Sequence, residues 1–101
     1  MKIALSLIST ILVSTSAFAS AELSEKKGCV ACHATDSKRI GPSYKEVAAK
    51  YAGNKEVVAA LAKKVVKGGG GVWGGTSPMP ANPQVTAAEA KTLVQWILTT
   101  K

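Results

Sequence analysis

The sequence is poor in the residue types that bind metals and build large cores. Its 101 residues include one histidine, two cysteines and five aromatic residues. One histidine and two cysteines fall short of the four protein ligands that a structural zinc site normally needs. A thioredoxin-like redox pair is expected near a βαβ pattern, and no strand-rich segment accompanies the two cysteines. Both of these functions are therefore disfavoured.

Long hydrophobic runs are also absent, apart from one near the N-terminus. This run, from Ile3 to Val13, has about half of the roughly 20 residues that a membrane-spanning helix needs. A lysine precedes it and the small-residue sequence Ala17-Phe18-Ala19 follows it, as in a secretory signal. We therefore expect residues 1–19 to be a cleaved signal peptide and residues 20–101 to form one exported domain. Cleavage after Ala21 and an uncleaved membrane anchor are the alternatives.

Both cysteines and the histidine lie within five residues, in the order Cys29-Val30-Ala31-Cys32-His33. Cys-x-x-Cys-His is an attachment sequence of c-type haem. Two thiols at this spacing can each add to a vinyl group of one haem, and the histidine that follows then lies beneath the iron. The pattern predicts one haem c bound covalently through Cys29 and Cys32, with His33 as the proximal iron ligand. Because so short a pattern can arise by chance, a second and independent feature is required.

That second feature is an isolated methionine. Apart from the initiator, Met79 is the only methionine, and it lies between Pro78 and Pro80 on a segment that the two rings make rigid. An isolated methionine ordinarily fills a gap in a core. With His33 already used, however, Met79 is the only soft ligand left for the sixth position of the iron, and we predict that it occupies this position.

Four helices are predicted, so the expected fold is all-α. Apolar periodicity and capping residues place them at 21–27, 43–53, 55–67 and 87–100. Asn54 is expected to cap the third helix, with Glu56 in its first turn. Thr86 and Glu89 are expected to form a capping box before the last helix. This last helix is expected to pack across the first and to close the fold over the haem.

The stretch from Gly68 to Gly75 contains six glycines, too many for a helix or a central strand. No Lys-Ser/Thr pair follows it, which excludes a phosphate-binding P-loop. Its expected use is close approach of the backbone to another group, with Gly68 ending the third helix. Trp73 is expected to anchor this stretch by packing, and its indole N–H could also hold a haem propionate.

The charge balance is basic, with 13 Lys and Arg against 6 Asp and Glu and a formal net charge of +7. Loss of residues 1–19 would remove one lysine and no acidic residue, which leaves +6. Such a charge favours partners with acidic surfaces, and simple solvation of the surface is the alternative. No nucleic-acid-binding motif is visible, so no nucleic acid is expected as a partner.

Four motifs occur together in one order. They are Cys29-Val30-Ala31-Cys32-His33, Gly41-Pro42, Gly71-Val72-Trp73-Gly74 and Pro78-Met79-Pro80-x-Asn82. With these motifs, residues 20–101 resemble a class I cytochrome c, and more narrowly the short single-haem periplasmic cytochromes c of denitrifying and ammonia-oxidising bacteria. The resemblance implies four short helices wrapped around one covalently attached haem. The segment from Gly74 to Met79 is one residue longer than the usual loop of this family.

Further site residues follow from the resemblance. It implies that the Pro42 carbonyl orients His33. It places Lys64 and Trp73 near a haem propionate. It also places Asn82 near the sulfur of Met79.

The implied function is electron transport, not catalysis. A soluble periplasmic monomer would cycle one electron between Fe(III) and Fe(II) and donate it to a nitrite reductase, a peroxidase or a terminal oxidase. Because His/Met ligation fills both axial positions, no open iron site remains for a substrate. The alternatives are an enzyme in which Met79 is displaced and an electron-transfer subunit held permanently in a larger complex. No membrane insertion is expected after processing.

Docking of a partner with an acidic surface would use cations near the exposed haem edge. The family layout nominates Lys26, Lys27, Lys38, Arg39, Lys63 and Lys67.

Overall fold

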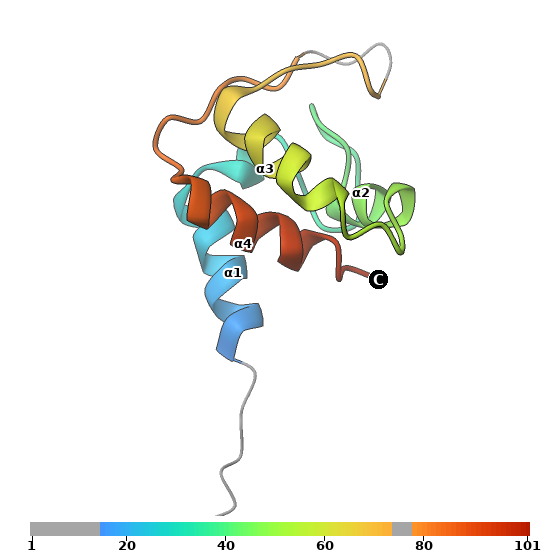
Figure 1. Cartoon of the computed structure of the whole chain (residues 1–101), viewed down its shortest axis with the longest axis horizontal. Coiled ribbons are helices and arrows are strands. Elements are labelled where there is room, and N and C mark those ends of the chain that lie inside the picture. The colour runs from blue at the N-terminus through green and yellow to red at the C-terminus, as the bar shows by residue number, and fades with distance from the viewer. Residues whose placement is uncertain (1–14, 74–77) are drawn as a thin grey trace, which may run out of the picture.

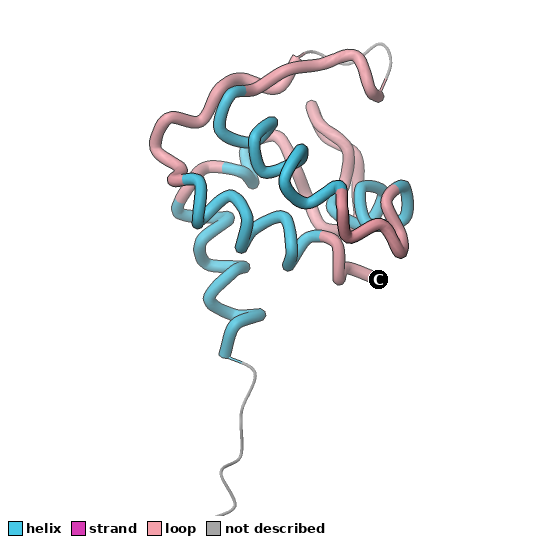
Figure 2. Tube along the Cα trace, in the orientation of Figure 1, coloured by secondary structure: helices cyan, strands magenta, loops and turns pink. Residues whose placement is uncertain are grey.

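The structure is a computed structural model that describes residues 15–73 and 78–101 (Figure 1). Within these ranges, every regular element is helical (Figure 2). The elements are α1 (Thr15–Lys26), the 3-10 turn η1 (Cys29–Ala31), α2 (Tyr44–Lys50), α3 (Val57–Lys67) and α4 (Ala87–Ile97). The expected all-α fold with four helices is confirmed.

Helix α4 forms the centre of this fold and contacts α1, α2 and α3. It begins at the expected capping box, in which Thr86 Oγ1 accepts the Glu89 N–H at 3.1 Å and Glu89 Oε1 accepts the Thr86 N–H at 3.0 Å. Ala90, Leu93 and Val94 on its inner face are almost completely buried. Figure 1 shows α4 crossing α1, which confirms the packing expected of the last helix.

Helix α1 begins earlier than predicted, at Thr15 and not at Ala21. The residues between these two positions include neither glycine nor proline, so nothing in them interrupts a helix. As a result, α1 passes through both expected cleavage points. The rest of the predicted signal, residues 1–14, lies outside the described residues. Among the helices described, none is both long and apolar enough to cross a membrane.

The start of α3 also differs from the prediction. Asn54 is not its N-cap, because Asn54 Oδ1 accepts the Glu56 N–H at 3.1 Å within the turn that precedes the helix. Glu56 itself occupies the N-cap position, makes no side-chain capping bond, and so does not lie in the first turn. The end of α3 at Gly68 is as expected, since the Gly68 N–H donates to the Lys64 carbonyl at 2.7 Å.

Two other helices are shorter than predicted. Helix α2 ends at Lys50, and a turn closes at Gly53, whose φ of 75° a side chain would disfavour. Helix α4 ends at Ile97, where Thr99 Oγ1 donates to the Trp96 carbonyl at 2.6 Å and competes with the helical pattern.

Candidate functional site

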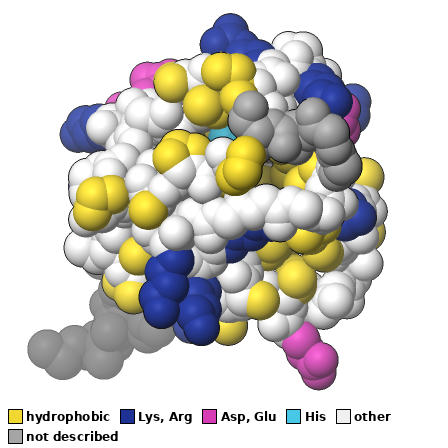
Figure 3. Space-filling model, turned by 90° about the horizontal axis from the view of Figure 1, so that it is seen from above, with side chains coloured by type: hydrophobic (Ala, Val, Ile, Leu, Met, Phe, Trp, Pro, Cys, Tyr) yellow, Lys and Arg dark blue, Asp and Glu magenta, His cyan; other side chains and the backbone are white. Residues whose placement is uncertain are grey.

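A cavity of about 140 Å³, partly open to solvent, lies between α2, α3, α4 and the loops that follow η1 and α3. Four side chains with sulfur or imidazole donors line it, namely Cys29, Cys32, His33 and Met79. Most other side chains of the lining are apolar and come from α2, α3, α4 and the loops between them. Figure 3 looks onto the face that carries the glycine-rich segment, and shows a cyan spot of histidine among hydrophobic side chains.

The two cysteines and the histidine are brought together by a tight turn. Gly28 opens this turn at a φ of 81°, in the left-handed region that glycine tolerates. The Cys32 and His33 N–H groups both donate to the Cys29 carbonyl, at 3.2 and 3.0 Å. Both cysteine side chains are half-buried, and burial raises the pKa of the Cys29 thiol.

A carbonyl fixes the tautomer of His33. His33 Nδ1 lies 2.6 Å from the Pro42 carbonyl oxygen. Because a carbonyl accepts and never donates, Nδ1 must carry the proton. The lone pair of Nε2 is then left for a metal, and the bond at Nδ1 makes the imidazole a better ligand.

Gly41 and Tyr44 confine the imidazole ring from two sides. A Cβ on residue 41 would lie 2.5 Å from His33 Cε1 and 2.9 Å from His33 Nδ1, so only glycine fits there. The Gly41 N–H donates to the Cys32 carbonyl at 2.8 Å, which closes the loop over the ring. The Tyr44 ring stacks on His33 with centroids 5.7 Å apart. Its hydroxyl donates to Ser24 in the interior, at 3.3 Å.

The Met79 segment is held against the glycine-rich segment by an isolated antiparallel bridge. The Gly69 N–H donates to the Met79 carbonyl at 3.0 Å, and the Met79 N–H donates to the Gly69 carbonyl at 2.8 Å. A Cβ on Gly68 would lie 2.5 Å from the Met79 carbonyl oxygen. The expected close approach of the backbone in this glycine-rich stretch is therefore made to the methionine segment. Its residues 74–77, which include most of the lengthened loop, lie outside the described residues.

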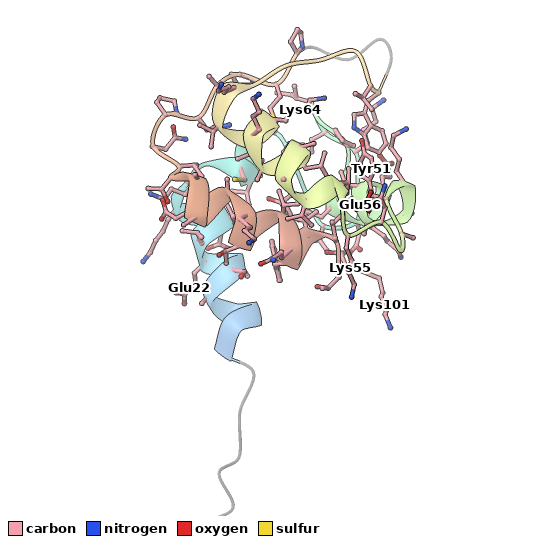
Figure 4. The ribbon with its side chains drawn as sticks, in the orientation of Figure 1. Glu22, Tyr51, Lys55, Glu56, Lys64 and Lys101 are labelled. Atoms are coloured by element: carbon pink, nitrogen blue, oxygen red, sulfur yellow. The ribbon has the colours of Figure 1, made fainter. Side chains whose placement is uncertain are left out.

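Lys64 and Trp73 both line the cavity, on α3 and on the glycine-rich segment. Figure 4 shows Lys64 on the half of α3 nearest to this segment, and its Cε comes within ordinary contact distance of the space beside Gly69. The cation closest to the indole is a different one. Lys50 Nζ, at the end of α2, lies 5.1 Å from the centroid of the Trp73 ring, a distance that gives a cation–π attraction.

Asn82 is not among the described residues that line the cavity. Its Nδ2 donates to the Val65 carbonyl at 2.8 Å and to the Pro80 carbonyl at 3.2 Å. Its own N–H donates to the Val66 carbonyl at 3.0 Å. Asn82 therefore ties the Met79 segment to the end of α3, while its position beside the methionine sulfur stays a prediction.

Sequence reasoning missed Gln84, which carries no chemical signature in the sequence. Its Nε2 donates to the Lys27 carbonyl at 2.9 Å and to Asn82 Oδ1 at 3.2 Å. Lys27 in turn is bound within the molecule, because its Nζ donates to the Gln84 carbonyl at 2.9 Å and lies 3.3 Å from Glu89 Oε1. Lys27 thus makes contacts within the molecule, and its use in docking stays a prediction.

The lining fits a haem in two respects. It presents two thiols beside one imidazole, and a thioether on a separate segment of the same cavity. Its apolar side chains match the large apolar faces of a porphyrin, and Gly41 leaves the histidine ring unobstructed. An all-α fold with this set of donors around one apolar cavity defines a small c-type haem protein.

Comparison with known proteins leads to the same class. The cytochrome c family model matches residues 19–101. The chain is 58% identical over 80 residues to cytochrome c-551 of Azotobacter vinelandii. The matched region covers 79% of this chain and 95% of the relative. It is 54% identical over 84 residues to cytochrome c-552 of Hydrogenobacter thermophilus. The matched region covers 83% of this chain and 84% of the relative.

A solved structure agrees with these relatives. The crystal structure of wild-type Nitrosomonas europaea cytochrome c552 is similar with a TM-score of 0.75 and 47% identity, over 80% of this chain and 99% of that one. The chain therefore belongs to the cytochrome c family. As a small class I cytochrome c it carries electrons and binds one haem c covalently through Cys29 and Cys32.

Proposed function

We propose that this cytochrome carries single electrons in the periplasm with its haem iron held between His33 and Met79. The observation that carries the proposal is that these two side chains line one cavity from different segments. When bound, the haem would supply an Fe(III)/Fe(II) couple, and ligation by His33 and Met79 would leave no open iron site and would raise the potential. The chain contributes the Nε2 lone pair of His33, fixed by the Pro42 carbonyl, and the thioether of Met79, fixed by the bridge to Gly69.

Two polar side chains of the cavity lining suit the haem propionates. Lys64 and Trp73 offer an ammonium group and an indole N–H on this lining. Lys50 adds a second positive charge above the Trp73 ring. Because a carboxylate in a partly apolar cavity is costly without donors or opposite charge, these groups are the proposed partners of the propionates.

Export and processing complete the proposal. The family match begins at residue 19, beside the expected cleavage point. Cleavage after Ala19 would leave α1 as residues 20–26, and Ser20 and Ser24 in this part are buried against the fold. The proposed partner is a nitrite reductase, a peroxidase or a terminal oxidase with an acidic surface, and the proposed state in solution is a monomer.

The test of the axial ligands is the substitution Met79→Ala in the haem-loaded protein. We expect loss of the low-spin His/Met spectrum, binding of small exogenous ligands and a lower reduction potential, because the sixth position opens. Val72→Ala is the matched control, since Val72 lines the same cavity but carries no donor atom, and it should keep the wild-type spectrum. An unchanged spectrum in Met79→Ala would contradict the assignment and point to another ligand, with Lys64 the first to examine.

A further inference from the structure

Two side-chain amides join the haem-attachment segment to the Met79 segment. Gln84 Nε2 donates one hydrogen to the Lys27 carbonyl and the other to Asn82 Oδ1, at 2.9 and 3.2 Å. Asn82 Nδ2 passes the connection on to the carbonyls of Val65 and Pro80, at 2.8 and 3.2 Å. In the sequence, Lys27 lies two residues before Cys29, and Pro80 lies directly after Met79. The relay therefore starts beside one thioether position and ends beside the proposed sixth ligand.

The chemistry of this relay requires a donor with at least two hydrogens at position 84, which the amide of Gln84 supplies. Both partners of Gln84 Nε2 are acceptors, a backbone carbonyl and an amide oxygen, so only a group with two hydrogens can bind both. Gln84 is exposed, which means that burial of apolar surface does not explain its placement. Its backbone adds a further link, because its carbonyl accepts from Lys27 Nζ at 2.9 Å.

We propose that Gln84 is a positioning residue for Met79. Its side chain fixes the Met79 segment relative to Cys29 and His33, and so sets how firmly the thioether stays on the iron. The bridge between Gly69 and Met79 holds the other side of the same segment, but it connects the methionine to α3 and not to the histidine. Gln84 supplies the connection to the histidine side. This inference rests on the proposed His33 and Met79 ligation.

The experiment is an imidazole titration of the ferric haem-loaded protein, followed by its absorption spectrum. Imidazole competes with Met79 for the iron, so its apparent affinity reports how firmly the thioether is held. In Gln84→Leu, which keeps the side-chain size but donates nothing, imidazole should bind about three- to tenfold more tightly than in the wild type. The reduction potential should fall in parallel. The matched control is Gln95→Leu, since Gln95 is an exposed glutamine on α4 without a side-chain hydrogen bond among the described residues.

Each outcome decides a different point. Equal imidazole affinities in Gln84→Leu, Gln95→Leu and the wild type, with a wild-type spectrum that shows methionine ligation, would overturn the role of Gln84 alone. A wild-type protein without a methionine-ligated spectrum would overturn the ligation and, with it, the role of Gln84. A lower unfolding midpoint in Gln84→Leu with unchanged imidazole affinity and potential would show a merely structural contact, and would also overturn the inference.

Discussion

At the scale of single residues, a hydrogen bond and the absence of a neighbouring Cβ together orient His33. The Pro42 carbonyl, 2.6 Å from Nδ1, holds the edge of the ring that carries the proton. The missing Cβ of Gly41 leaves room for the ring, because a Cβ there would lie 2.5 Å from His33 Cε1. Neither contact suffices alone, because the hydrogen bond needs the ring to come close and the glycine allows but does not enforce that approach.

Gly41→Ala should therefore disturb both contacts. The added methyl would lie 2.5 Å from His33 Cε1, and relieving that overlap should cost about 1–3 kcal/mol of unfolding free energy. The bond to Pro42 should lengthen, and the reduction potential should rise because a less electron-rich imidazole stabilises Fe(III) less. Denaturant unfolding and voltammetry measure the two effects.

Gly28→Ala is the control for this prediction. Residue 28 has a φ of 81° but nothing within 4 Å of an added Cβ. Its substitution should lower the stability by about 1–2 kcal/mol through backbone strain and leave the potential unchanged. If Gly41→Ala had the same potential as Gly28→Ala, the contact with the ring would not be what constrains residue 41.

Residues whose role is set by near neighbours could be predicted, and the others could not. Cys29, Cys32 and His33 lie within five residues, and their spacing together with the isolated Met79 predicts a haem site. Gln84 depends on which segments meet in space, and the sequence places it 57 positions from its partner Lys27. Lys50 above Trp73 is a similar case. The sequence contains several lysines and does not indicate which of them approaches the indole.

At the scale of elements, the start of α4 is linked to the end of α1. Glu89 accepts the Thr86 N–H within the capping box and also pairs with Lys27 at 3.3 Å. The bond from the Thr86 backbone, followed by Lys27, holds the pKa of the Glu89 carboxyl below its ordinary value of 4.5. A carboxyl whose pKa is lower in the folded state stabilises the fold above the unfolded-state pKa, and this stabilisation is lost as the pH falls through the folded-state pKa.

Glu89→Gln should accordingly lower the melting temperature at pH 7 and have little effect in acid. Glutamine can still accept the Thr86 N–H, so the substitution removes the charge and keeps the cap. Melting curves of both proteins between pH 7 and pH 2 should converge as the pH falls below the ordinary glutamate pKa of 4.5. Thr86→Ala should instead cost about 1 kcal/mol throughout. A difference between Glu89→Gln and wild type that stays constant with pH would refute the charge contribution.

Elements with a complete local signal could be predicted closely. Thr86 and Glu89 define the start of α4, and Gly68 defines the end of α3, because each acts through bonds within one turn. The predicted start of α3 was wrong because Asn54 accepts the Glu56 N–H, which belongs to the turn before the helix. The predicted start of α1 was wrong because helix-forming residues continue on both sides of the expected cleavage point. A cleavage point does not by itself interrupt a helix.

At the scale of the whole molecule, the surface combines exposed apolar side chains of the cavity lining with exposed lysines. Ile40 and Val72 line the cavity and are 59% and 46% exposed. Among residues 19–73 and 78–101, the salt bridge found is the one between Lys27 and Glu89. Lys26 and Lys38 are exposed and have no ion pair in these ranges. The apolar rim suits a brief contact with a partner, and the lysines suit attraction over a distance.

Electron transfer to a redox protein of strongly negative charge should therefore depend on salt. The screening length shrinks from about 30 Å at 0.01 M to about 8 Å at 0.15 M ionic strength, so the second-order rate should fall about tenfold or more across this range. Lys26→Glu with Lys38→Glu should slow the reaction at low salt and leave the potential nearly unchanged. Lys27 is excluded from this variant because its charge is already paired with Glu89. Lys55→Glu with Lys91→Glu is the matched control, because both lysines are exposed, both line a different hollow beside α4, and the double variant makes the same change of charge. If all three proteins reacted at one rate, or if the wild-type rate were independent of salt, docking would be governed by the apolar rim, and the basic charge would serve solvation alone.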